Sequence, residues 1–160
     1  AWITGAFFFL EAAARLAGAH TFIVALPDGY DTHLRGSGGG RGVQLSAGQA
    51  QLLALARALV HQPALLLLDE ATAALDAESD AAFRAALRTV TAQHQTAVVT
   101  IAHRLSTALA SDRVILFDHG RIVEEGSPQA LAAAEGRLSA LLQLEAAGWD
   151  WRSTLGPSAP

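Results

Sequence analysis

The sequence predicts an α/β fold with a mostly parallel sheet and flanking helices. Two short, predominantly apolar runs, 65–68 and 96–102, are typical of strands that are covered on both faces of a parallel sheet. Segments with apolar residues at helical spacing precede and follow the first run, so helices and strands alternate along the chain. Ligands of such sheets bind outside the carboxyl ends of the strands. The polar residues that follow the two runs are therefore the first candidates for a functional site.

Composition narrows the possible functions. The chain has 160 residues, of which 51% are hydrophobic and 16% are charged, which favours one folded domain over a disordered chain. A formal net charge of -4 offers no basic surface for nucleic acid, so we expect no nucleic-acid partner. The absence of cysteine excludes thiol catalysis and cysteine-ligated metals. All 11 basic residues are arginine, so a GxxxxGK[ST] phosphate loop does not occur within these residues.

The first part of the chain is expected to be helical. Residues 1–10 form a separate N-terminal segment, whose apolar run is too short to span a membrane. Residues 11–26 are predicted to be helical, and a Pro-Asp-Gly turn ends this helical segment. The glycine-rich stretch 36–42 lacks GxGxxG spacing, so we interpret it as a surface linker. A further helix is predicted from Ser46 to about residue 61, where apolar residues recur at helical spacing.

Strands and helices alternate through the rest of the chain. Glycine, proline and aspartate separate the periodic segments and mark their ends. The predicted elements are a strand at 65–68, a helix at 77–93, a strand at 96–102, a short helix at 105–110, a hairpin of strands 113–117 and 121–124, helices at 128–134 and 136–146, and a fraying tail at 147–160.

Two carboxylates follow the first predicted strand. Asp69 is placed to hold Mg²⁺ through a water molecule, because Mg²⁺ keeps most of its hydration shell. Glu70 is placed to polarise an attacking water as a general base. The structural alternative is that Asp69 caps a turn and Glu70 is solvated. The four leucines before the pair favour the functional interpretation.

Other candidate residues stand at helix starts and after the second strand. Ser46 is a helix N-cap, an anion ligand or both, since both roles use the unpaired amides of a first turn. Gly48 leaves room for a phosphate. Asp76 either caps the next helix or belongs to the site, and His103 donates a hydrogen bond to a phosphate or to a backbone carbonyl. Surface positions are expected for the remaining histidines, which are His20, His33, His61, His94 and His119.

Several motifs, taken in order, resemble the nucleotide-binding domain of ABC transporters. They are LSAGQ at 45–49, LLLLDEAT at 65–72, ALD at 74–76 and IAHRLST at 101–107. Three further segments resemble the exporter branch of that family, namely LPDGYDT at 26–32, DRVI at 112–115 and GRIVEEG at 120–126. The resemblance covers residues 11–146 and corresponds to the C-terminal part of such a domain. It implies a partial ABC-type ATPase fold, similar to P-loop NTPases, with part of the helical signature subdomain and without the phosphate-loop part.

The resemblance also implies a role for each motif. Ser46, Gly48 and Gln49 match the signature motif and, with the D-loop Asp76, would contact ATP held by the partner domain. Asp69 matches the Walker B aspartate, which holds Mg²⁺ through water. Glu70 matches the catalytic glutamate and His103 the switch histidine that senses the γ-phosphate.

The implied activity is ATP hydrolysis at a head-to-tail dimer interface, which drives export. The implied partners are a second nucleotide-binding domain and transmembrane domains, at the cytoplasmic face of the cell membrane. Residues 1–10 contain no counterpart of the Walker A loop, the adenine-stacking aromatic residue or the Q-loop glutamine. This chain by itself is therefore expected to be inactive. Two alternatives remain: a degenerate, non-catalytic remnant or interaction module, and an ABC ATPase of the DNA-repair or chromosome-organising type, which the acidic charge and the lack of heptads disfavour.

Overall fold

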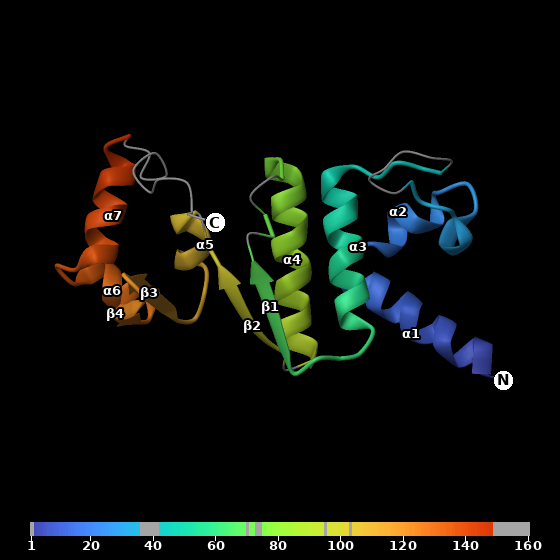
Figure 1. Ribbon diagram of the computed structural model, residues 1–160, viewed down its shortest axis with the longest axis horizontal. Helices are drawn as coiled ribbons and strands as arrows, with labels where there is room; N and C mark the ends of the chain where they lie inside the picture. The colour runs from blue at the N-terminus through green and yellow to red at the C-terminus, as the bar shows by residue number, and fades with distance from the viewer. Residues whose placement is uncertain are drawn as a thin grey trace. The chain divides into compact units, whose positions relative to one another are not determined.

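The computed structural model describes residues 2–35, 42–69, 71–72, 75–94, 96–102 and 104–148 (Figure 1). These residues divide into two compact units, 1–101 and 102–160, which we describe separately. The first unit contains α1 (Trp2–Leu16), α2 (His20–Val24), the 3-10 helix η1 (Gly29–Asp31), α3 (Ala47–Leu59), β1 (Leu65–Asp69), α4 (Ala77–His94) and β2 (Ala97–Ile101). The second contains α5 (Leu105–Leu109), β3 (Val114–Asp118), β4 (Arg121–Gly126), α6 (Pro128–Ala133) and α7 (Arg137–Ala146).

The segment predicted to be helical, 11–26, is helical for the most part, but it is divided between two helices. α1 begins at Trp2, so it includes most of the separate segment proposed for residues 1–10, and it ends at Leu16. Gly18 has a φ of 71°, a left-handed conformation that glycine adopts readily. The Gly18 N–H donates to Arg15 O at 3.1 Å and the Ala19 N–H donates to Ala14 O at 2.7 Å, which is the Schellman pattern of a helix end.

Strands β1 and β2 pair in parallel, and the register runs from Leu65 opposite Ala97 to Asp69 opposite Ile101. The two predicted strands are thus confirmed to within one residue at each end. The predicted covering on both faces is wrong within the described residues. Leu66 faces the core, whereas Leu67 on the opposite face is 69% exposed. The reason is that the helices of this unit contribute side chains to a core on one face of the sheet.

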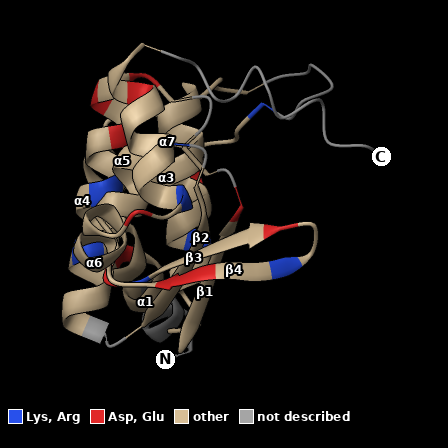
Figure 2. Ribbon diagram, turned by 90° about the vertical axis from the view of Figure 1, so that its left-hand side faces the viewer, with Lys and Arg blue, Asp and Glu red and all other residues tan. Residues whose placement is uncertain are grey.

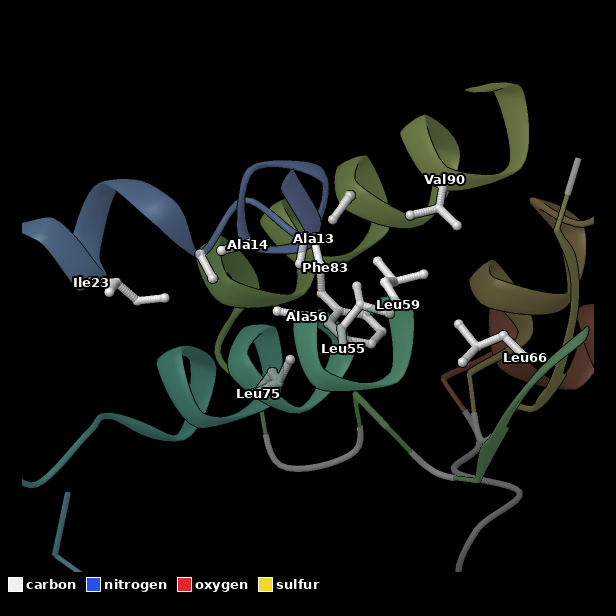
Figure 3. Close-up of a cluster of buried hydrophobic side chains, with 13 residues drawn as sticks. Ala13, Ala14, Ile23, Leu55, Ala56, Leu59, Leu66, Leu75, Phe83 and Val90 are labelled. Atoms are coloured by element: carbon white, nitrogen blue, oxygen red, sulfur yellow. The ribbon is translucent and has the colours of Figure 1, made fainter. Parts of the chain in front are cut away.

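Helices α1, α3 and α4 share one hydrophobic core with the covered face of the sheet (Figure 3). Alanines on α1 allow close approach, and larger side chains of α3 and α4 fill the space between the helices. The most buried large side chains of this core are Phe83 and Val90 on α4. The core residues labelled in Figure 3 are Ala13, Ala14, Ile23, Leu55, Ala56, Leu59, Leu66, Leu75, Phe83 and Val90.

The second unit is built around the predicted hairpin, which is confirmed. Strands β3 and β4 pair antiparallel, with an irregularity between Leu116 and Phe117. His119 and Gly120 both have positive φ, at 47° and 73°, as a two-residue type I′ hairpin turn requires. Acidic and basic residues lie along the hairpin strands (Figure 2), and Arg113 pairs with Glu125 across them. Among the described residues, no helix is both long enough and apolar enough to cross a membrane.

Candidate functional site

The signature segment forms the start of α3. Ser46 is the N-cap: its Oγ accepts a hydrogen bond from the Gln49 N–H at 3.1 Å. The Gln49 Oε1 accepts one in return from the Ser46 N–H at 3.0 Å, which completes a capping box. The N-cap prediction for Ser46 is confirmed. The remaining amides of a first helical turn point along the axis away from the helix, where an anion is stabilised.

Gly48 lies where the first turns of α3 and α4 meet. A Cβ atom on residue 48 would overlap the Ser79 hydroxyl oxygen and would lie 2.7 Å from Ser79 Cβ. Real Cβ atoms do not approach other atoms so closely, so this helix crossing requires glycine. Helix packing is therefore a structural reason for Gly48, beside the predicted contact with a phosphate, which stays a prediction.

Asp76 caps α4, as its position before that helix predicted. Its Oδ1 accepts a hydrogen bond from the Ser79 N–H at 2.9 Å, and its Oδ2 accepts one from the Ser79 hydroxyl at 2.9 Å. The backbone hydrogen bond from Ser79, followed by the hydroxyl bond, lowers the pKa of Asp76 below its ordinary value. Asp76 is exposed and ionised at neutral pH, so its carboxylate is available to a partner surface.

Asp69 is the last residue of β1, and its side chain is exposed at the carboxyl end of the parallel pair. Gln51 lies on α3, the helix that begins with the signature segment, and connects this helix to the end of the strand. Its Nε2 donates to the carbonyl oxygen of Ala71 at 2.5 Å, two residues beyond Asp69. Helix α3, which begins with the signature segment, thus contacts the segment after Asp69 directly and is linked to Asp76 through Ser79.

The described residues contain no group of three or more His, Cys, Asp or Glu side chains able to hold a metal ion. A single carboxylate fits Mg²⁺ nonetheless, because this ion is commonly bound by one or two carboxylates, water and the phosphates of a substrate. Asp69, with its exposed carboxylate at a strand end, is suited to that arrangement. Glu70 and His103 lie outside the described residues, so their roles as general base and switch histidine remain predictions.

One histidine differs from its predicted surface position. His20 is half-buried, and its Nδ1 lies 2.9 Å from the Tyr30 hydroxyl, which joins α2 to η1. Burial, followed by the charge of Glu11, raises the pKa of Tyr30. Exposed positions are confirmed for His33, His61 and His119, and the side chain of His94 lies outside the described residues.

Gln51 and Ser79 hold the site segments together and were not predicted as site residues. Neither carries a sequence signal of its own: each is a polar residue on a helix, and its partner is defined only when the helices pack. Asp76 and Ser79 have the D-x-x-S spacing of an N-cap residue and the third residue of a helix. Their mutual hydrogen bonds could therefore have been predicted from the sequence.

A family model described as ABC transporter matches residues 24–73. An ABC-type transporter, fsqE, from Aspergillus fumigatus is 50% identical over 136 residues, which are 85% of this chain and 10% of the relative. A cyclolysin secretion/processing ATP-binding protein, CyaB, from Bordetella pertussis is 47% identical over 84% of this chain and 18% of its own length. A putative multidrug export ATP-binding/permease protein from Staphylococcus aureus is 43% identical over 83% of this chain and 22% of its own length.

The fold is also similar to a solved structure, a bacterial Atm1-family ABC exporter with ATP bound. The TM-score is 0.69 at 38% sequence identity, and the match covers 95% of this chain and 24% of the exporter chain. In each of these comparisons the chain spans less than a quarter of the related protein. The chain is similar over most of its length to ABC exporters and corresponds to part of their ATP-binding region.

Proposed function

We propose that this chain forms the signature and Walker B part of an exporter's ATP-binding subunit, in which ATP is bound and hydrolysed at a head-to-tail interface with a second such domain. One observation carries the proposal: the Ser46 cap, the start of α4 at Asp76 and the segment after Asp69 all gather on helix α3. Motif segments far apart in the sequence thus share one rigid support, as a site that must hold phosphates requires.

The chain contributes residues to two ATP sites, that of its own subunit and that of the partner domain. The first turn of α3, capped by Ser46, binds the γ-phosphate of the ATP held by the partner domain. Asp69 serves the subunit's own ATP and holds Mg²⁺ through water, and this ion neutralises charge on the β- and γ-phosphates when bound. Glu70 takes a proton from the attacking water. His103 donates a hydrogen bond to the γ-phosphate and so responds to its loss.

The phosphate loop must come from outside these 160 residues, because they contain no lysine. The proposed partners are accordingly the segment that carries the phosphate loop, a second ATP-binding domain and the membrane-spanning domains of an exporter, at the cytoplasmic face of the membrane. Support comes from the related proteins, which include a putative multidrug export ATP-binding/permease protein and an exporter with ATP bound.

The proposal is tested with the complete gene product, including any residues that flank these 160, purified and assayed for Mg²⁺-dependent ATP hydrolysis. We expect turnover, and we expect Glu70→Gln to abolish it while ATP binding persists, because the amide keeps the shape of the side chain but is no base. Glu78→Gln, a similar change at an exposed position on α4, serves as the matched control and should keep turnover. A gene product that does not hydrolyse ATP would refute the proposal in favour of a non-catalytic remnant.

A further inference from the structure

Ser79 makes two kinds of contact at once, although no motif assigns it a role. Its N–H and its hydroxyl donate to the two carboxylate oxygens of Asp76, each at 2.9 Å. Its side chain also fills the space next to Gly48, on the signature turn of α3. One small side chain therefore touches two of the motif segments.

The geometry makes these contacts interdependent. The Ser79 hydroxyl lies where a side chain on residue 48 would begin, so the signature turn cannot move toward α4 without displacing that hydroxyl. A displaced hydroxyl loses or weakens its hydrogen bond to Asp76 Oδ2, since hydrogen bonds weaken steeply with poor angles. Asp76 is exposed, so these two bonds, rather than burial, set the direction of its carboxylate.

We propose that Ser79 is a positioning residue that transmits the placement of the signature turn, residues 46–49, to the carboxylate of Asp76. The inference rests on the proposed function, in which that turn binds the partner's ATP and Asp76 lies at the same interface. Anion binding at the turn holds α3 against α4, and Ser79 then holds Asp76 in the direction that the partner domain meets. Ser79 itself does not touch the nucleotide.

The first test measures the titration of the Asp76 side-chain carboxyl by NMR in the 160-residue chain. Ser79→Ala removes the hydroxyl donor and keeps the N–H donor, so the pKa of Asp76 should rise toward its ordinary value. Gly48→Ala should raise the same pKa, although the added methyl group is on the other helix. Thr91→Ala, which removes an exposed hydroxyl from the same helix α4, is the matched control and should leave the titration unchanged.

A rescue experiment separates coupling from simple loss of fold. Gly48→Ala should lower the urea midpoint of unfolding, because the added methyl group overpacks the helix crossing. Ser79→Gly should restore the midpoint, because the nearest remaining atom, the Cα of residue 79, lies 3.8 Å from the new methyl group. Ser79→Ala should not restore it, since Ser79 Cβ lies only 2.7 Å away. In the double variant, Gly48→Ala with Ser79→Gly, the stability should be restored. The pKa of Asp76 should nevertheless stay raised, because the Ser79 hydroxyl is absent.

The second test uses the complete gene product. Ser79→Ala should lower kcat about two- to tenfold, the range for one lost hydrogen bond, with the KM for ATP unchanged, and Thr91→Ala should change neither. An Asp76 titration that is the same in Ser79→Ala, Gly48→Ala and the unsubstituted chain would overturn the inference, as would an unchanged kcat in Ser79→Ala. If the unsubstituted gene product does not hydrolyse ATP, the proposed function fails, and the NMR titrations alone then decide whether Ser79 couples the two segments.

Discussion

Asp76 shows how one residue serves both folding and a proposed site. Both of its carboxylate oxygens accept hydrogen bonds from Ser79, and these bonds lower the pKa of the carboxyl group. The negative charge also lies at the N-terminus of α4, where the helix dipole favours it. The residue therefore stabilises the first turn of α4 while it presents an ionised carboxylate at the surface.

The sign of the pKa change gives a pH-dependent prediction. A folded-state pKa below the unfolded value of 3.8 means that Asp76 stabilises the fold above that pH, and that this contribution is lost as the pH falls through the folded-state pKa. Asp76→Asn keeps an N-cap but cannot accept the Ser79 hydroxyl proton through its amide nitrogen. We expect the variant to be less stable than the unsubstituted chain at about pH 7, and we expect the difference to be smaller at about pH 3, below the unfolded value. Urea unfolding at both pH values measures the difference; a difference that is equal at both would contradict this assignment.

Local residue roles were more predictable from the sequence than tertiary ones. The caps of Ser46 and Asp76 follow from the residue type immediately before a periodic segment, and both are confirmed. The tight contact of Gly48 with Ser79 was not predictable, because it depends on how α3 crosses α4. The half-buried position of His20 was not predictable either, because its partner Tyr30 belongs to a neighbouring element.

At the scale of elements, the sequence predicted which segments form helices and strands better than it predicted where each element begins and ends. The alanine-rich start of the chain has helical periodicity across the break, and only the left-handed Gly18 divides α1 from α2. The two apolar runs became strands as predicted, but continuous apolarity does not show whether both faces are covered. One face of the β1–β2 pair remains exposed within the described residues.

That exposed face predicts self-association of the 160-residue chain. Leu65, Leu67, Val99 and Ile101 lie on it and are 51–69% exposed, and contiguous apolar surface of this kind promotes association. Replacing Leu67 and Val99 with threonine should lower the apparent mass in sedimentation velocity. Leu144→Thr, which changes an apolar residue of α7 that is 40% exposed, is the control and should not lower it. A monodisperse monomer before any substitution would contradict the prediction.

The start of α7 depends on a carboxylate from the hairpin. Glu124 of β4 accepts hydrogen bonds from the backbone N–H groups of Arg137 and of Leu138, the latter at 3.0 Å. Removing it leaves first-turn amides without this cap, so Glu124→Ala should lower stability by about 0.5–2 kcal/mol. Chemical denaturation monitored by circular dichroism checks this. Glu145→Ala, at the other end of α7, is the matched control, and an equal effect of both variants would contradict the capping role.

At the scale of the whole molecule, the similarity to ABC exporters was predictable from the sequence, because the motifs occur in that family's order; the relatives described above are 43% to 50% identical. The way in which the chain assembles with other domains was not predictable from the sequence. The chain spans 10% to 22% of the curated relatives described above, so the surfaces that complete its site belong to residues beyond these 160 in our proposal. The exposed sheet face and the ionised Asp76 are the features of this chain that such an assembly would use.

In the proposed function, the signature turn acts on the ATP of the partner domain. In the complete gene product, Ser46→Arg blocks the first turn of α3 and Glu70→Gln removes the base, so each variant alone should be inactive. A mixed dimer of the two keeps one intact site, formed by Glu70 of the first variant and Ser46 of the second.

The most direct measurement is therefore ATP hydrolysis by mixed subunits, with both variants co-expressed and assembled at random. If each site combines residues from two subunits, about a quarter of the unsubstituted activity should return, because about half of the dimers are mixed and each has one working site. If Ser46 and Glu70 serve the same ATP within one subunit, every site carries a defect. Activity no higher than that of either variant alone would then contradict a site shared between two subunits.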